Sequence, residues 1–318
     1  MIKIGIDLDG GDFNATHNIK AVEDYLSKSI NKDVKVYGYT KDDITFKHNN
    51  FILVKCVDYI SDDDTIISFR RKKESSMVKM INDLKEGIID SGISAGNSGV
   101  LMASSSLILG TWKKNIRAAF APMLRNVVTN EKMIILDAGA NIENSVDDLV
   151  TYASIGSSVI RKYAKQAPKV GLINNGTEDK KGTEIHKEVN KRLREDKNIN
   201  FIGNIEPREL IASDANVIVT DGWSGNMVVK SYEGMGRQIT NEVKKGLSSG
   251  FLSKFAALLI KEKLKKIFSK FDYREYGASL ILGVNGIVLK AHGESDLFTL
   301  NNALNFAFEL SKSDFIKK

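Results

Sequence analysis

The chain has a single cysteine, Cys56, only three prolines and no long apolar run, and these shortages exclude several classes of protein. One thiol cannot close an intramolecular disulfide, which argues against a disulfide-stabilised secreted domain. No apolar segment reaches the roughly 18 residues that a membrane-spanning helix needs, and the early acidic residue Asp7 argues against a signal peptide. Only four histidines are present, so a histidine-based metal site is a weak interpretation. We therefore expect a cytosolic protein with no bound metal and no cofactor, in which Cys56 is a small buried hydrophobic residue.

The net charge of +6 at pH 7 is concentrated in one segment. Residues 251–271 hold six lysines against one glutamate, whereas the charges elsewhere nearly cancel, so no nucleic-acid partner is expected. Large apolar residues alternate with these lysines at near-helical spacing. Core packing explains part of such a stripe, but its lysines and phenylalanines favour a helix that lies on an anionic membrane surface. The expected membrane contacts are Phe251, Leu252, Phe255, Leu259 and Lys261.

Apolar β-branched runs alternate with helical patterns along the whole chain. The expected strands are 2–6, 34–39, 51–54, 87–90, 133–136, 169–173, 200–203, 217–220, 279–283 and 286–290. This alternation predicts an α/β fold with a mostly parallel sheet flanked by helices, and ligand sites beyond the carboxyl ends of the strands. No linker separates independent domains. We therefore expect residues 1–318 to form one interleaved catalytic unit with room for two lobes.

A loop of small polar residues follows the expected strand 87–90. This loop, Ser94-Ala95-Gly96-Asn97-Ser98-Gly99, opens onto a helical pattern at 99–110. Such a loop lets backbone N–H groups approach an anion at the positive end of a helix dipole. The expected phosphate-binding residues are Gly96, Asn97, Ser98 and Gly99. A second loop of this kind, 221–226, follows the strand 217–220, and two such loops favour an enzyme that acts on an anionic substrate.

Polar residues also follow other expected strands. The first strand ends in Asp7-Leu8-Asp9-Gly10-Gly11-Asp12, for which a tight turn with Asp12 as a helix N-cap is favoured over a metal site. The Asp137 carboxylate only accepts hydrogen bonds at pH 7, so it is suited to orienting hydrogen-bond donors rather than to contacting phosphate. Lys181 supplies a mobile point charge for phosphate or an oxyanion, although a loop lysine is more often simply exposed. His292 could act as an acid or base, but a hydrogen-bonded histidine at a strand end is favoured.

A basic run, Arg70-Arg71-Lys72-Lys73, stands at the start of an expected helix. A charge run is usually a solvated face, and that interpretation stays open here. The functional alternative is that Arg70, Arg71, Lys72 and Lys73 attract an acidic protein partner or a phosphate-bearing cofactor arm.

Taken together and in order, six strings resemble the PlsX family of phosphate acyltransferases of bacterial phospholipid synthesis. They are 94–99, 136–141, 176–182, 200–204, 221–226 and 290–293. The resemblance runs from the first strand to the last helix. It implies a fold similar to that of phosphotransacetylases and isocitrate-type dehydrogenases, and a homodimer at the cytoplasmic face of the cell membrane. The implied reaction converts acyl–acyl carrier protein and inorganic phosphate to acyl phosphate and free carrier protein. A partner glycerol-3-phosphate acyltransferase then consumes the acyl phosphate.

The chemistry of this reaction assigns roles to particular residues. Phosphate is already an anionic nucleophile and a thiolate is a good leaving group, so the protein needs only to bind, align and stabilise charge. Lys181 is expected to offset the charge of phosphate or of the oxyanion. Asn226, matched through the Asp-Gly-x-x-Gly-Asn string, is expected to donate its amide to the oxyanion. Asp137, Asp221 and His292 are expected around the phosphate and thioester, and the basic run 70–73 is expected to receive the carrier protein.

Three alternatives remain open at this stage. A short-chain phosphotransacetylase would use coenzyme A in place of the carrier protein. A nicotinamide dehydrogenase is disfavoured, because no Gly-x-Gly-x-x-Gly string follows a strand. A membrane-bound scaffold would bind lipid vesicles without any phosphate-dependent turnover.

Overall fold

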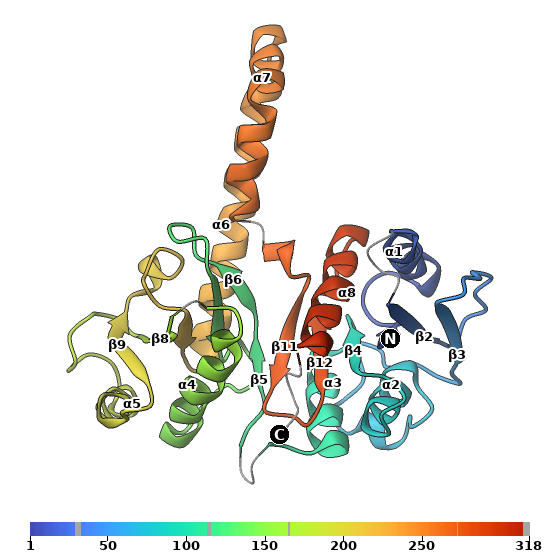
Figure 1. Ribbon diagram of the computed structural model, residues 1–318, viewed down its shortest axis with the longest axis horizontal. Helices are drawn as coiled ribbons and strands as arrows, with labels where there is room; N and C mark the ends of the chain where they lie inside the picture. Colours follow the sequence, from blue (N-terminus) through green and yellow to red (C-terminus); the bar gives the residue numbers. More distant parts are fainter. Residues whose placement is uncertain (29–32, 113–115, 165, 272, 314–318) are drawn as a thin grey trace. The chain divides into compact units, whose positions relative to one another are not determined.

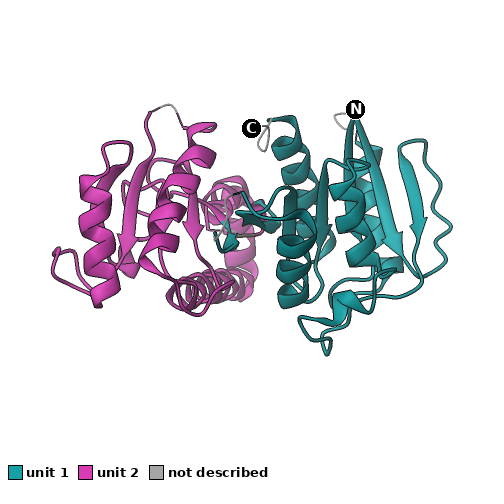
Figure 2. Cartoon of the chain, turned by 90° about the horizontal axis from the view of Figure 1, so that it is seen from below, with its two compact units in different colours: residues 1–122, 276–318 teal, residues 123–275 magenta. Residues whose placement is uncertain are grey.

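The computed structural model describes residues 1–28, 33–112, 116–164, 166–271 and 273–313. The chain divides into two compact units (Figure 2). Unit 1 comprises Met1–Pro122 and Tyr276–Lys318, and unit 2 comprises Met123–Glu275. Each unit has its own sheet and its own helices (Figure 1). That the whole chain serves one catalytic function stays a prediction.

Unit 1 is built on a seven-stranded sheet in the order β3-β2-β1-β4-β12-β11-β5. Its strands are β1 (Ile2–Asp7), β2 (Val34–Thr40), β3 (Phe51–Lys55), β4 (Ser91–Ser94), β5 (Ala119–Ala121), β11 (Ala278–Leu282) and β12 (Ile287–Ala291). The strands from β3 to β12 run parallel, whereas β11 and β5 are antiparallel to their neighbours. The carboxyl ends of β1, β4 and β12 therefore lie side by side.

Helices cover both faces of this sheet. They are α1 (Ala15–Ser27), α2 (Ser76–Lys85), α3 (Ser98–Ser104) and α8 (Leu297–Lys312), together with the short turns η2 (Ser68–Arg70) and η3 (Ser105–Leu109). α8 packs against α1 and against β1, β4 and β12, while α2 packs against β1, β2 and β4 together with α3. The core on the α2 side includes Met77, Met80 and Ile81. Cys56 is buried in this core, as expected.

The expected strand 87–90 is wrong, because the fourth strand is Ser91–Ser94. Gly87 has a φ of +73°, the left-handed conformation that ends α2, and the apolar pair Ile88-Ile89 belongs to the turn that follows. All four residues of β4 are buried, although the sequence Ser-Gly-Ile-Ser carries little apolar signal. Its burial follows from its position between β1 and β12 in the sheet.

Unit 2 contains a five-stranded sheet in the order β6-β7-β10-β8-β9. Its strands are β6 (Met123–Arg125), β7 (Lys132–Leu136), β8 (Lys169–Ile173), β9 (Asn200–Ile205) and β10 (Val217–Val219). All are parallel except β6. Its helices are α4 (Val146–Arg161), α5 (Glu184–Glu195), α6 (Gly222–Ser248) and α7 (Phe251–Ser269), with the short turns η4 (Pro207–Glu209) and η5 (Tyr273–Glu275). The carboxyl ends of β7, β10 and β8 are adjacent.

Side-chain caps fix where the helices of unit 2 begin. Ser145 and Asp148 form a capping box at the start of α4. Thr183 accepts a hydrogen bond from the His186 N–H at the start of α5, and Asp221 accepts one from the Ser224 N–H at the start of α6. The predicted α/β class with mostly parallel strands flanked by helices is confirmed, although the strands form two sheets.

Candidate functional site

In unit 1, three loops meet at the carboxyl ends of β1, β4 and β12. The Asp12 N–H donates to the Gly293 carbonyl over 3.0 Å. Gly11 has a φ of +92°, and a methyl group added there would lie 2.9 Å from both the Ala95 side chain and the Gly293 carbonyl oxygen. Only glycine therefore fits at this meeting point. The structure brings the N-terminal Asp-Gly-Gly-Asp loop and the 290–293 string to the predicted phosphate loop, 94–99.

The helix cap expected at Asp12 is wrong. The Asn14 side chain caps α1 by accepting the His17 N–H over 2.9 Å. Asp9, in the same loop, instead accepts hydrogen bonds from the Thr40 hydroxyl and the Lys41 N–H. Among the residues that the structure describes, no group of three or more His, Cys, Asp or Glu side chains could hold a metal ion.

A buried carboxylate, Asp7, anchors the start of the predicted phosphate loop. The Ser94 hydroxyl donates to Asp7 Oδ2 over 2.7 Å and accepts the Gly96 N–H over 3.1 Å. Burial raises the pKa of Asp7 to about 6, and the nearby charge of Asp9 adds to the increase, while the hydrogen bond from Ser94 opposes it. The Gly96 N–H is therefore turned inward to Ser94, so Gly96 shapes the loop through a bond that is not available to a ligand.

The raised pKa of Asp7 predicts a pH-dependent stability difference. The unfolded carboxyl ionises at its ordinary pKa of 3.8 and the folded one at about 6, so the cost of ionising the buried group grows as pH rises through this window. Asp7→Asn removes this cost. The stability of the variant relative to the wild type should rise by about 1 kcal/mol from pH 5 to pH 8, measured by urea unfolding. Asp90→Asn, at an exposed carboxylate that accepts the Lys3 N–H, is the control. Parallel pH profiles for Asp7→Asn and the wild type would contradict the prediction.

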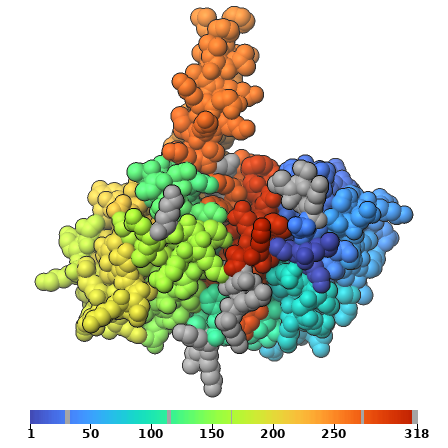
Figure 3. Space-filling model, viewed as in Figure 1, coloured from blue at the N-terminus to red at the C-terminus, as the bar shows by residue number. Residues whose placement is uncertain are grey.

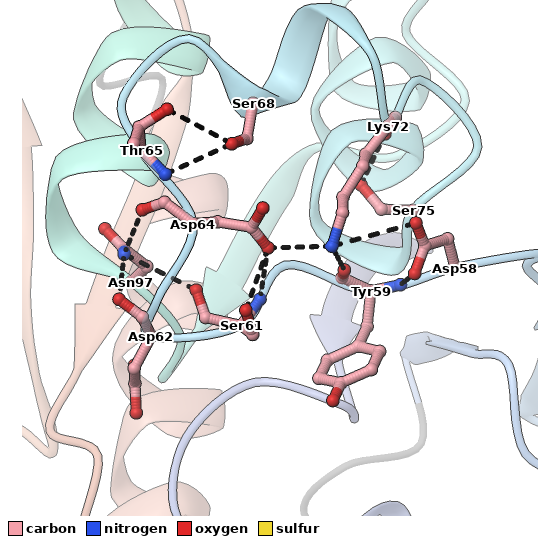
Figure 4. A network of polar contacts seen from close by, with 10 residues as sticks. All are labelled: Asp58, Tyr59, Ser61, Asp62, Asp64, Thr65, Ser68, Lys72, Ser75 and Asn97. Carbon is pink, nitrogen blue, oxygen red and sulfur yellow. Dashed lines mark hydrogen bonds and ion pairs between the residues drawn. The ribbon is translucent and has the colours of Figure 1, made fainter.

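The Asn97 side chain holds a neighbouring loop in place (Figure 4). Its Nδ2 donates to the carbonyls of Asp62 and Asp64 over 3.1 and 3.0 Å, and its Oδ1 accepts the Val100 N–H over 3.1 Å. Both ends of the amide are thus used within the protein. The structure assigns Asn97 a loop-fixing and helix-capping position, so direct phosphate binding by its side chain is not supported.

Ser98 and Gly99 remain the open part of the loop. The Ser98 side chain is exposed and Gly99 is half-buried under Ile66. The structure gives the N–H groups of these two residues no acceptor among the residues it describes, as is usual in the first turn of a helix. Phosphate binding by Gly96, Asn97, Ser98 and Gly99 stays a prediction, with the backbone of Ser98 and Gly99 best placed for it.

The string 290–293 places two different side chains at this edge. His292 is exposed beside Gly293. Lys290 is partly buried, and its ammonium donates to the Ala95 carbonyl over 2.9 Å and to the Ala291 carbonyl. Sequence reasoning gave Lys290 no role, because a lysine at a strand end carries no signal of its own. Its contact with the predicted phosphate loop is visible only in the folded chain.

In unit 2, a second group of loops lies at the carboxyl ends of β7, β8 and β10. The Asp137 carboxylate, fully buried, accepts the backbone N–H groups of Ala140 and Asn141 over 3.0 and 2.8 Å. It also accepts the Asn141 side-chain amide over 2.8 Å. Asp137 therefore folds the loop that follows β7, and its position around the phosphate and thioester stays a prediction.

Asn226 lies against this loop. A methyl group added at Gly139 would approach the Asn226 Cγ within 3.0 Å, and one added at Gly225 would lie only 1.9 Å from the Asp137 carbonyl oxygen. The first turn of α6 can pack this closely only because Gly225 has no side chain. Asn226 is half-buried. The structure thus brings Asp137, Asp221 and Asn226, predicted separately from two strings, to one edge of the sheet.

Lys181 lies in the loop after β8, at the same edge. Its aliphatic stem packs over Gly176, where an added methyl group would lie 3.0 Å from the Lys181 Cγ. Its carbonyl accepts the Asn174 side-chain amide over 3.0 Å, which fixes the backbone. The side chain is exposed, and its ammonium has no carboxylate partner among the described residues. A fixed backbone with an exposed side chain suits the predicted role.

His186 lies beside this group and was missed from the sequence. Its Nδ1 lies 2.7 Å from the Thr183 hydroxyl, and its Nε2 lies 4.0 Å from Asp221 Oδ2. Burial lowers the pKa of His186, although the charge of Asp221 opposes this effect. A histidine inside a helix gives no pattern that predicts its contact with Asp221, 35 residues later in the sequence.

The predicted site residues are divided between the two units. The 94–99 loop belongs to unit 1, whereas Lys181 and Asn226 belong to unit 2.

The basic run 70–73 is not uniform. Arg70, Arg71 and Lys73 are exposed. Lys72 is half-buried and donates to Asp64 Oδ2 over 2.8 Å and to the Tyr59 carbonyl over 3.1 Å (Figure 4). The hydrogen bond with Asp64 raises the pKa of Lys72. Lys72 thus binds the same loop that Asn97 holds. The other three side chains of the run are accessible to an acidic protein partner.

The predicted lipid-binding segment forms one arm of a helical hairpin. α6 and α7 pack side by side and are joined by Ser249 and Gly250 (Figure 1). No residue of α7 is buried, and the helix lies in the projecting part drawn in orange in Figure 3. Phe251 and Leu252 are 85% and 81% exposed, and Leu259 is 72% exposed. The structure has no helix, within its described ranges, that is long and apolar enough to span a membrane.

Comparisons with known proteins identify the family and the fold of the chain. A family model described as "Fatty acid synthesis protein" matches residues 2–318. A phosphate acyltransferase from Mycoplasma capricolum subsp. capricolum is 33% identical over 100% of this chain and 97% of its own length. A branched-chain phosphotransacylase from Enterococcus faecalis V583 has a TM-score of 0.60 at 13% identity, covering 97% of this chain and 98% of its own.

A phosphotransacetylase from Streptococcus pyogenes gives a TM-score of 0.56 at 16% identity, covering 98% of this chain and 94% of its own. At such low identity these two structures show the fold alone, and that fold is the phosphotransacetylase-like one expected from the sequence strings. The family itself is shown by the match over residues 2–318 and by the full-length relative. The chain therefore belongs to the PlsX family of phosphate acyltransferases.

Proposed function

We propose that this protein transfers an acyl group from the acyl carrier protein to inorganic phosphate, for phospholipid synthesis. The observation that carries the proposal is the full-length match to a phosphate acyltransferase, 33% identical over 100% of this chain. The polar loops at the carboxyl ends of two sets of parallel strands support it, because α/β proteins bind their ligands there. The proposed products are acyl phosphate and free carrier protein.

The reaction needs no nucleophile from the protein. A phosphate oxygen attacks the thioester carbonyl carbon, so a carbon–oxygen bond forms, the carbon–sulfur bond breaks, and the sulfur leaves as a thiolate that takes up a proton. The one thiol of the chain is unsuited to attack, because burial raises the pKa of Cys56 to about 12. The protein's tasks are to hold phosphate and to stabilise the oxyanion.

We assign these tasks to the two groups of loops. The 94–99 loop of unit 1, through the backbone at Ser98 and Gly99, binds phosphate. In unit 2, the Asn226 amide donates to the oxyanion and the Lys181 ammonium offsets developing negative charge. Asp137 and Asp221 hold the backbone around Asn226 through the hydrogen bonds of their carboxylates.

Docking of the acidic carrier protein is proposed at the exposed part of the basic run. Arg70, Arg71 and Lys73 are exposed, and the loop beside them is fixed to the phosphate loop by Asn97. Opposite charges steer such an encounter and make its rate salt-dependent. His292 is also exposed beside the phosphate loop, and we place it within reach of the incoming substrate.

The α6–α7 hairpin is proposed to bind the cytoplasmic face of the cell membrane, with the protein as a homodimer. Its exposed apolar residues and its lysines provide the two attractions that an interfacial helix uses. Membrane contact would keep the reactive acyl phosphate near a glycerol-3-phosphate acyltransferase that consumes it.

Charge placed on the exposed apolar face of α7 should release the protein from membranes. Each large apolar side chain contributes about 2 kcal/mol when it leaves water, so Leu252→Glu together with Leu259→Glu should lower partition onto phosphatidylglycerol vesicles by more than tenfold in co-sedimentation. Val57→Glu, at an 80% exposed apolar residue of unit 1, is the matched control. Equal sedimentation of all three proteins would refute membrane contact through α7.

A turnover assay tests the proposed activity. The full-length protein is incubated with long-chain acyl–carrier protein, with and without phosphate, and release of free carrier protein is followed. We expect release only with phosphate and little reaction with acetyl coenzyme A. Preference for acetyl coenzyme A would instead identify a short-chain phosphotransacetylase, and vesicle binding without turnover would identify a scaffold.

A further inference from the structure

Lys290 is a charged residue of the unit 1 loop cluster for which the proposed reaction has no use so far. It is the fourth residue of β12, next to β4 in the sheet, and is paired in register with Ser94. Its ammonium donates to the carbonyl of Ala95, inside the predicted phosphate loop, over 2.9 Å. A second hydrogen bond runs to the Ala291 carbonyl. The cation is therefore held against the loop by two fixed acceptors.

The carboxylates around Lys290 favour its charged form. The carboxylates of Asp62, Asp12 and Asp7 all act on it, and they oppose the burial that lowers the pKa of Lys290 to about 8. Three negative groups at one edge of the sheet would repel an anion. The Lys290 ammonium is the cation that the structure places on the 94–99 loop itself, among the residues it describes.

The position of the ammonium also fits the chemistry of phosphate binding. Lysine binds phosphate as a point charge with three donors, and two of these donors are used by the Ala95 and Ala291 carbonyls. Because both acceptors are backbone groups, the ammonium is fixed in place before any ligand arrives. A fixed donor costs little conformational entropy on binding.

We propose that Lys290 is the phosphate-binding cation of this enzyme: its ammonium fixes the Ala95 carbonyl and attracts inorganic phosphate to the 94–99 loop. This inference rests on the proposed function, since it names the residue that recognises the nucleophile of that reaction. It also assigns the two lysines different tasks: Lys290 binds phosphate, whereas Lys181 of unit 2 offsets developing negative charge.

The test is the Michaelis constant for inorganic phosphate in the acyl–carrier protein assay with the full chain. Lys290→Met keeps the length of the side chain and removes its charge. We expect the KM for phosphate to rise about tenfold, as loss of a charge-assisted hydrogen bond predicts, with a smaller change in kcat. Lys290→Arg retains the charge and should recover part of this loss. Lys20→Met, at an exposed residue of α1, should match the wild type.

The pH profile separates phosphate binding from a purely structural role. The ammonium loses its proton above about pH 8, so the wild-type KM for phosphate should rise there. Asp7 has already ionised below this range, and the carboxylates facing Lys290 are the same in every variant. Lys290→Arg should not show this rise, because arginine stays protonated. If Lys290→Met does not fold, the pH dependence of the KM for phosphate in Lys290→Arg still tests the inference.

Two results would overturn the inference while leaving the proposed function intact. One is an unchanged KM for phosphate in Lys290→Met with normal wild-type turnover. The other is a rise above pH 8 in Lys290→Arg equal to that of the wild type. Absence of phosphate-dependent turnover in the wild type would instead reject the proposed function, and with it the inference.

Discussion

Asn226→Ala is expected to lower kcat for phosphate-dependent release of the carrier protein by about 10²–10³-fold, the usual cost of removing one oxyanion donor. The amide is half-buried and lies against Gly139, directly after Gly225, where α6 packs closely against the Asp137 loop. This packing restricts the amide before the transition state forms, and preorganised donors stabilise developing charge best. The KM values should change much less than kcat, because the oxyanion exists only in the transition state.

Asn241→Ala is the matched control for this prediction. Asn241 is an exposed asparagine on the same helix, α6. Its replacement should leave kcat unchanged, and circular dichroism should show both variants to be folded. If Asn226→Ala retained more than half of the wild-type kcat, Asn226 would not be the oxyanion donor.

Lys181→Ala is expected to reduce kcat/KM for the acyl–carrier protein reaction by about a hundredfold, as loss of a hydrogen bond to a charged group predicts. The Lys181 side chain is exposed, so its ammonium is accessible to the substrate. The aliphatic stem crosses Gly176, and the backbone is tied to Asn174 through the Lys181 carbonyl. Alanine therefore removes the charge and leaves the backbone bond in place.

The neighbouring residue provides the comparison. Lys180 is exposed in the same loop, and Lys180→Ala removes an equal charge without touching Gly176. Equal losses for the two variants would show that only the general positive charge of the loop matters. A loss confined to Lys181→Ala, partly restored in Lys181→Arg, is the expected result.

Much of the fold could be predicted because its signals are local. Strand positions such as 169–173 agree with the structure residue for residue, since buried parallel strands are continuous apolar runs. The strand at 87–90 was misplaced because Ile88-Ile89 outweighs the weak signal of Ser91–Ser94. Only the neighbours β1 and β12 make the latter a strand.

The roles of individual loop residues were harder to predict than the loops. The string 94–99 spans a strand-to-helix junction as expected, although Ser94 ends β4 and Ser98 already begins α3. The Gly96 N–H and the Asn97 amide, however, donate to Ser94 and to the loop at 61–64. A sequence shows which residues can donate hydrogen bonds, but not which acceptors lie within hydrogen-bond distance in the folded protein. The same holds for Lys72, one of four basic residues in a row, which is tied to Asp64.

By itself, the sequence determined the α/β class, the family, the exclusion of disulfide chemistry and the strand-end loops, because these depend on composition and on the order of residues along the chain. Only the tertiary structure decided that Lys290 lies on the Ala95 carbonyl, that Asp7 is buried beneath Ser94, and that His186 faces Asp221. Each of these contacts joins residues far apart in the sequence. They form because parallel strands bring their carboxyl ends to one edge of a sheet, whatever the distance between them along the chain.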